Sequence, residues 1–159
     1  MSQILELLAR NARVSDSELA VMLGKTEQEV ADEIEELEKS GVIKGYTTLI
    51  DQAVENPNMV TAYIELKVNP MAESGFDDIA RFIAQYDAVK TVTLMSGAYD
   101  LGITITGENL RVISDFVARQ LSTIDGVIST ATHFELKNYK VNGILMCDEE
   151  NDERGFVSP

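Results

Sequence analysis

The sequence predicts an α+β protein of two modules, an N-terminal group of three helices connected as a helix-turn-helix and a C-terminal βαββαβ sheet. Two observations carry this prediction. Two helix-capping patterns follow one another closely within residues 1–50, and a segment of the C-terminal half is repeated 38 residues further along the chain. Residues 51–59, with Asn56-Pro57-Asn58 and no periodicity, are predicted to link the two modules.

The first module is predicted from the residues that begin and end its helices. Residues 15–18 and 26–29 both have the Ser/Thr-x-x-Glu pattern, in which side chains satisfy free backbone N–H groups at a helix start. Gly24 and Gly41 end the second and third helices. Because the turn between these helices is so short, they must cross steeply. The apolar faces of the three helices consist of Ile4, Leu5, Leu7, Leu8, Leu19, Ala20, Leu23, Val30, Ile34 and Leu37.

Residues 42–50 are rich in β-forming side chains, with Gly45 at a possible bend. They are expected to form one or two strands, which would complete a winged helix-turn-helix over residues 1–50.

An internal repeat predicts the second module. Residues 79–89 and 117–127 each combine the end of an amphipathic helix, a turn and the start of a strand, and several of their positions are identical. An alternating segment, residues 60–68, precedes the first helix, and residues 101–105 precede the second. Two βαβ units in tandem give the ferredoxin-like βαββαβ arrangement.

Helices can cover only one face of such a sheet. The opposite face, with Tyr63, Thr91 and Thr93, needs another cover, so a homodimer is predicted. One more strand is expected within residues 137–146, from Tyr139 to Met146, which extends the second module over residues 60–146. The acidic residues 147–159 have little to bury and form a predicted tail.

Composition limits the class of protein. The 159 residues are 45% hydrophobic and 25% charged, which is typical of a globular protein. No apolar run approaches the roughly 20 residues of a membrane span, and the N-terminus lacks the pattern of a secretory signal. The single cysteine, Cys147, favours a reducing compartment, so we expect a cytoplasmic protein. The net charge of −14 opposes nucleic-acid binding unless basic residues gather locally.

Two motifs add a family resemblance. Residues 37–46 read Leu-Glu-Lys-Ser-Gly-Val-Ile-Lys-Gly-Tyr, and residues 96–101 read Ser-Gly-Ala-Tyr-Asp-Leu. With residues 11–15, 18–20 and 23–24, and in this order, they resemble the Lrp/AsnC (feast/famine) family of transcription regulators over about residues 3–140. The resemblance implies a DNA-binding domain, a RAM-type ligand-sensing domain, amino acids as common effectors, and dimers that often assemble into octamers.

If the first module binds double-stranded DNA, its third helix, residues 26–40, should enter the major groove. The basic side chains predicted to contact phosphates are Arg10, Arg13, Lys25 and Lys44, and Thr26 and Gln28 are the polar groups at the helix start. The same helix carries seven acidic residues and a single lysine, Lys39. The alternative is therefore a protein with weak or no DNA binding of its own, which senses an amino acid and acts through a partner subunit.

The best candidate for an effector site is the hairpin of residues 95–100. Gly97 is expected to permit a backbone with exposed N–H groups, which suit a carboxylate. Asp100 is a partner for an ammonium group and Tyr99 an aromatic wall. Without the resemblance, an ordinary hairpin turn is the favoured explanation of these residues, and the resemblance reverses that preference. The resemblance adds Thr130 and Thr132, because in the family the last strand and the hairpin lie near the clefts between dimers where effectors bind. The full set of predicted effector residues is Met95, Ser96, Gly97, Tyr99, Asp100, Thr130 and Thr132.

Other chemistry has little support in the sequence. His133, the single histidine, has no cysteine or carboxylate at metal-ligand spacing, so neither a metal nor another cofactor is expected. The chain lacks a nucleophile elbow, a P-loop and a dinucleotide-binding fingerprint, so we do not expect an enzyme.

Overall fold

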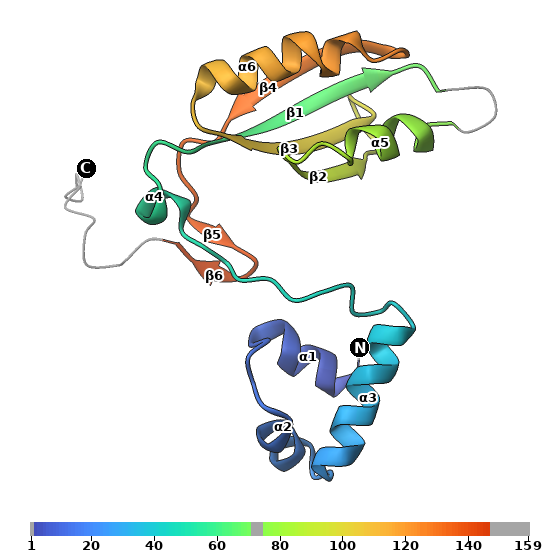
Figure 1. Cartoon of the computed structure of the whole chain (residues 1–159), viewed down its shortest axis with the longest axis vertical. Coiled ribbons are helices and arrows are strands. Elements are labelled where there is room, and N and C mark those ends of the chain that lie inside the picture. The colour runs from blue at the N-terminus through green and yellow to red at the C-terminus, as the bar shows by residue number, and fades with distance from the viewer. Residues whose placement is uncertain (1, 71–74, 147–159) are drawn as a thin grey trace, which may run out of the picture. The chain divides into compact units, whose positions relative to one another are not determined.

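The computed structural model describes residues 2–70 and 75–146, and it divides into two units, Met1–Ile50 and Asp51–Pro159, each with a hydrophobic core of its own (Figure 1). The predicted acidic tail, with Cys147, lies outside the described residues. Within the described ranges, no helix is long and apolar enough to cross a membrane.

The first unit consists of the helices α1 (Gln3–Arg10), α2 (Asp16–Leu23) and α3 (Glu27–Lys39). Both predicted capping boxes are formed. The Ser15 hydroxyl accepts from the Glu18 N–H at 3.3 Å while the Glu18 carboxylate accepts from the Ser15 N–H at 2.9 Å, and Thr26 and Glu29 repeat the arrangement. Gly24 follows α2 with φ +65°, so glycine relieves a backbone strain there. The predicted helix-turn-helix is confirmed.

The core of the first unit is small. Four side chains are buried, Ile4 of α1, Leu19 and Ala20 of α2, and Val30 of α3, and every other residue of the predicted apolar faces packs partly buried around them.

The predicted wing strands are wrong. Residues 43–50 belong to no strand. A β-strand is stable only when its N–H and C=O groups pair with a neighbour, and β-forming composition alone does not supply that neighbour. Residues 51–59, predicted as a linker, contain the one-turn helix α4 (Gln52–Glu55), which Asp51 caps.

The second unit is built on a four-stranded antiparallel sheet of β1 (Val60–Val68), β2 (Val89–Leu94), β3 (Leu101–Gly107) and β4 (Val127–Phe134), in the order β2-β3-β1-β4. The connecting helices are α5 (Asp77–Ile83) and α6 (Leu110–Arg119), and a 3-10 turn, η1 (Leu121–Thr123), follows α6. The predicted βαββαβ arrangement, and with it the α+β class, is confirmed.

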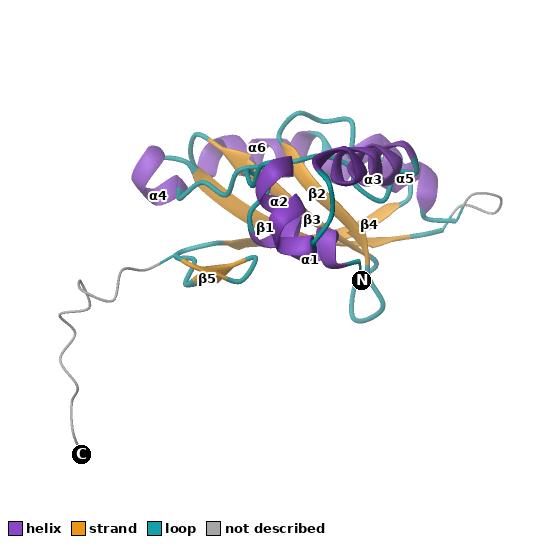
Figure 2. Cartoon of the chain, turned by 90° about the horizontal axis from the view of Figure 1, so that it is seen from below, coloured by secondary structure: helices purple, strands orange, loops and turns teal. Residues whose placement is uncertain are grey.

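Both helices cover the same face of this sheet, as Figure 2 shows with helices in purple and strands in orange. The two copies of the repeat occupy equivalent places in the core. Ile79 and Ile83 of the first copy are buried, as are their counterparts Val117 and Leu121 of the second. Twelve buried side chains make up this core.

The other face of the sheet, here called the open face, has no cover among the described residues of this unit. Burial alternates along β1, so Ala62, Ile64, Leu66 and Val68 face the helices while Tyr63, Glu65 and Lys67 lie on the open face. Register places the neighbouring strands in the same way, since directly opposite residues share a face. The open face includes Thr91, Thr93, Gly102, Thr104, Ser129, Ala131 and His133.

A further strand was expected over Tyr139–Met146, and this is wrong in detail. The segment is a small hairpin of β5 (Lys140–Val141) and β6 (Ile144–Leu145). Asn142 and Gly143 form its turn with φ of +49° and +84°. An Asn-Gly pair between β-forming residues is a strong hairpin signal, because both residues adopt positive φ readily.

Candidate functional site

Three of the six predicted DNA contacts are engaged with acidic groups of α3. Lys25 forms an ion pair with Glu33, and the Gln28 amide donates to the Asp32 carboxylate at 2.8 Å. The Thr26 hydroxyl caps the helix and donates to the Glu29 carboxylate at 2.8 Å. These side chains stabilise the start of α3, so a nucleic acid would have to displace the acidic partners before it could use them.

Arg13 and Lys44 have no acidic partner among the described residues, and both are exposed. Arg10, at the end of α1, is likewise exposed and has no acidic partner among the described residues. The free positive charge of the first unit therefore lies outside α3, at the end of α1 and after Gly41.

Most acidic side chains of α3 have a local role. Hydrogen bonds to the Thr26 backbone and hydroxyl lower the pKa of Glu29, and contacts with Lys25 and Ser2 lower the pKa of Glu33. Glu35 pairs with Lys39 within the helix, and Glu38 accepts a hydrogen bond from the Tyr46 hydroxyl at 2.8 Å. The helix is therefore acidic partly because its acids cap it, pair within it and hold the chain that follows.

The predicted effector hairpin connects β2 to β3. Met95 to Ala98 are exposed, whereas Tyr99 and Asp100 are half-buried against β1. The Met95 N–H donates to the Asp100 carbonyl at 2.8 Å, which closes the hairpin. A Cβ at Gly97 would meet nothing within 4 Å. Gly97 is not among the glycines with positive φ, so the backbone conformation does not itself require glycine there, and exposure of its N–H to a carboxylate stays a prediction.

Asp100 has a structural role in addition to its predicted one. Its N–H donates to the Leu66 carbonyl at 2.9 Å, and its carboxylate accepts from the Val68 N–H at 2.9 Å. The carboxylate retains further lone pairs. The pairing of Asp100 with an ammonium group stays a prediction.

Tyr99 contacts Tyr63, for which the sequence predicted only a place on the open face. Its hydroxyl lies 2.7 Å from that of Tyr63, and the two rings meet edge to face with centroids 6.2 Å apart. This hydrogen bond, together with burial, raises the pKa of Tyr63 to about 12, so its hydroxyl keeps its proton at any physiological pH.

Thr130 and Thr132 do not share a pocket with the hairpin inside one chain. They are half-buried on the helix-covered face of β4, opposite Leu66 and Ile64 of β1. Leu101, the first residue after the hairpin, lies opposite Leu66 on the other side. Thr130 is thus level with the base of the hairpin but two strand spacings away, or about 10 Å.

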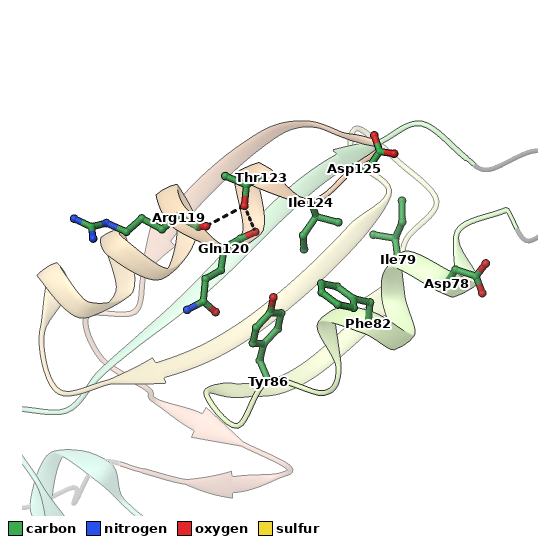
Figure 3. A pocket seen from close by; sticks show the side chains of 9 residues that line it. All are labelled: Asp78, Ile79, Phe82, Tyr86, Arg119, Gln120, Thr123, Ile124 and Asp125. Carbon is green, nitrogen blue, oxygen red and sulfur yellow. Dashed lines mark hydrogen bonds between the residues drawn. The ribbon is translucent and has the colours of Figure 1, made fainter.

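A separate cavity of about 570 Å³ lies on the helix-covered side of the sheet (Figure 3). Phe82 and Tyr86 form one wall and meet edge to face at 5.7 Å, and Ile79 and Ile124 add apolar surface. Asp78, Arg119, Gln120, Thr123 and Asp125 are also at its border. No pattern in the sequence predicted this cavity, although residues of both copies of the repeat line it.

His133 lies on the open face and pairs with Glu65 across 3.3 Å. Within the described ranges, no group of three or more histidines, cysteines or carboxylates is placed to hold a metal ion.

Comparisons with known families and proteins agree with this architecture. The Lrp/AsnC ligand binding domain matches residues 61–145, and a winged helix-turn-helix DNA-binding family matches residues 2–44. The chain is 42% identical to YugG, an uncharacterised HTH-type transcriptional regulator of Bacillus subtilis, over 99% of its own length and 96% of the relative's. It is 32% identical to LysM, an HTH-type transcriptional regulator of Sulfurisphaera tokodaii, over 85% and 91% of the two lengths.

Two solved structures share the fold. A transcriptional regulator of Neisseria meningitidis in complex with L-methionine superposes with a TM-score of 0.72 at 21% identity, over 89% of this chain and 93% of that one. A leucine response regulatory protein of Mycobacterium tuberculosis gives 0.74 at 22% identity, over 92% and 100%. At this level of identity the likeness concerns the fold alone.

Proposed function

The chain belongs to the Lrp/AsnC family of helix-turn-helix transcriptional regulators, and on this premise we propose that it binds DNA through Arg13, Lys44 and the start of α3, and that an amino acid controls it from the hairpin of residues 95–100. Family membership confirms the resemblance inferred from the sequence. The protein is a transcriptional regulator with a helix-turn-helix and a ligand-binding domain. The effector, the contact residues and the oligomer belong to the proposal.

The distribution of free charge supports the choice of DNA contacts. Phosphate contacts contribute most of the affinity of such proteins, and they require cations that are not already neutralised. Arg13 and Lys44 meet this requirement, whereas Lys25 is paired with Glu33. The start of α3 adds partly positive N–H groups, and Thr26 and Gln28 are polar groups at that end.

The exposed hairpin supports the choice of effector site. It presents unhindered backbone at Gly97, a carboxylate at Asp100 and an aromatic ring at Tyr99, which together suit the carboxylate, ammonium and side chain of an amino acid. Because Thr130 and Thr132 lie about 10 Å away, we propose that a second copy of the chain helps to close the site. The L-methionine complex of the Neisseria protein makes this amino acid the first one to test.

The open face supports the proposal of a homodimer, and an octamer is the larger assembly proposed from the family. A sheet covered by helices on one side and by nothing on the other is stable as a two-layer structure only when its second face is polar or covered. On this face, Tyr63 contributes an aromatic ring and a hydroxyl, and the neighbouring threonines contribute methyl groups and hydroxyls. The same patch on two copies forms a closed, two-fold interface.

DNA binding is tested by fluorescence anisotropy on the DNA upstream of the protein's own gene, between 50 and 200 mM salt. We expect binding that weakens as salt rises. No binding below about 10 μM at low salt, where non-specific contacts already operate, contradicts the DNA-binding half of the proposal.

Effector binding is tested by the shift in melting temperature on addition of each amino acid, with L-methionine first. Gly97→Trp should abolish the shift, because its side chain would enter the space above the hairpin without meeting the chain itself. Equal shifts in wild type and variant contradict this site.

A second candidate is a regulator with little DNA affinity of its own, which acts through a basic partner subunit. Residues 1–50 contain ten acidic side chains and five basic ones, and ion pairs occupy two of the five. Amino-acid binding without DNA binding, together with recovery of DNA binding on addition of a basic member of the same family, would favour this candidate.

A further inference from the structure

Tyr63 occupies an unusual position on the open face. A Cβ built on Gly102 would lie 2.0 Å from the Tyr63 hydroxyl oxygen and 2.8 Å from the ring carbon that carries it. The hydroxyl end of the ring therefore lies against Gly102 of β3, in space that any side chain at position 102 would fill. Gly102 is buried for the same reason, on a face whose other residues are exposed or half-buried.

This placement directs the Tyr63 hydroxyl toward the hairpin. β3 lies between β1 and β2, and Gly102 is the second residue of β3, directly after the hairpin. The ring crosses from β1 over Gly102, and its hydroxyl meets that of Tyr99 at 2.7 Å. A residue with a Cβ at position 102 would displace the ring and break this hydrogen bond.

β1 therefore holds two consecutive residues of the hairpin. Tyr99 is bonded through its side chain to Tyr63, and Asp100 through its N–H and its carboxylate to Leu66 and Val68. The Asp100 contacts involve the strand backbone. The Tyr99 contact depends on one hydroxyl group and on the absence of a side chain at Gly102.

We propose that Tyr63, seated on Gly102, is a positioning residue for the effector hairpin: through its hydrogen bond to Tyr99 it holds residues 95–100 in the conformation that binds the effector. This inference rests on the proposed function of the hairpin. A site ordered in advance binds more tightly because less conformational freedom is lost on binding. Since Tyr63 lies on the open face, the cover of that face and the order of the hairpin are linked through a single side chain.

The test compares Tyr63→Phe, Tyr99→Phe and the double variant with the wild type. Each change removes one hydroxyl and keeps the ring in place. The matched control is Tyr46→Phe, which removes a hydroxyl bonded to Glu38 in the other unit. Two quantities are measured on the full chain: amide hydrogen exchange of residues 96–101 without ligand, and the dissociation constant of L-methionine.

We expect both single variants to exchange several-fold faster in the hairpin and to bind L-methionine roughly 2- to 10-fold more weakly, the range set by one hydrogen bond. The double variant should be no worse than either single one, because all three lack the same bond. The control should behave as the wild type. Unchanged exchange in Tyr63→Phe, or additive losses in the double variant, overturns the inference.

The exchange measurement separates failure of this inference from failure of the proposed function. If the wild type binds no amino acid, the effector assignment fails, while faster exchange in Tyr63→Phe still supports the positioning role. Gly102→Ala gives an independent check, since its Cβ displaces the Tyr63 ring and leaves both hydroxyls present. We expect faster hairpin exchange with an unchanged far-UV circular dichroism spectrum. Wild-type exchange in this variant would also overturn the inference.

Discussion

The two units of this chain use their polar and apolar residues differently. Among the residues that the structure describes, the sheet unit buries twelve apolar side chains between its strands and two helices, while the helix-turn-helix unit buries four. The smaller unit instead has two complete capping boxes and several ion pairs and hydrogen bonds along α3. We infer that burial dominates the stability of the sheet unit, and that local polar contacts supply a larger share in the helical unit.

The largest effect is expected from a cavity in the sheet core. Ile103 lies on the central strand β3 and is fully buried, so Ile103→Ala should lower the free energy of unfolding by about 2–5 kcal/mol. Urea denaturation followed by circular dichroism measures this loss. Ile128→Ala is the control, because Ile128 is exposed in β4 and should change stability little. Similar losses in both variants would contradict the dominance of burial in this unit.

A smaller effect is expected from a helix cap in the first unit. Thr26→Ala removes the hydroxyl that caps α3 and should lower the stability of residues 1–50 by about 1 kcal/mol. Hydrogen exchange of the amides in α3 reports this loss directly. Thr48→Ala, in the extended segment after α3, should leave that exchange unchanged. A Thr26→Ala variant with wild-type exchange would mean that the small core alone maintains the helix.

The same polar contacts should limit DNA affinity. Lys44→Ala is expected to reduce the dependence of log affinity on log salt by about one, because one phosphate contact is lost. Lys25→Ala should change it little, since Glu33 already neutralises Lys25. Glu33→Gln should strengthen binding by releasing Lys25. Anisotropy titrations at several salt concentrations measure all three, and an equal loss for Lys25→Ala and Lys44→Ala would contradict the role assigned to the ion pair.

The smallest effect concerns acid pH. Hydrogen bonds from the capping residues lower the pKa of Glu18 and Glu29 from the usual 4.5. A carboxyl group whose pKa is lowered by folding stabilises the folded protein at pH values above 4.5. This contribution is lost as the pH falls through the pKa of the group in the folded state. Nuclear magnetic resonance should therefore show the first turns of α2 and α3 loosening below pH 4.5. A Glu18→Gln, Glu29→Gln variant should lose this pH dependence; if it loosens over the same range, other groups are responsible.

How far the sequence predicts each unit follows from how local the signals are. Each capping box and each copy of the repeat depends on residues close together in the chain, and the structure contains both features. The wing strands failed because a strand depends on a partner that composition does not reveal. The hairpin of Asn142 and Gly143 was missed although its turn signal was present.

The candidate site was harder to predict for the same reason. The sequence singled out Tyr99 and Asp100, but their partners Tyr63 and Val68 are more than thirty residues away along the chain. The pairing of Lys25 with Glu33 depends on the turn between α2 and α3 and also escaped prediction. These contacts with distant residues change what Tyr99, Asp100 and Lys25 are expected to bind, and the sequence alone does not reveal them.

The strand order has a consequence for how the sheet unit assembles. β1 and β2, which belong to the first half of the repeat, do not pair with each other, because β3 lies between them; β3 and β4 of the second half are separated by β1. A polypeptide with one half alone would contain two strands without a mutual partner. We therefore expect the two halves to fold together, and the hairpin of residues 95–100 is the covalent connection between them. A ligand bound to this hairpin would therefore stabilise the whole sheet. Ligand binding at a short loop would then raise the stability of the entire domain against unfolding.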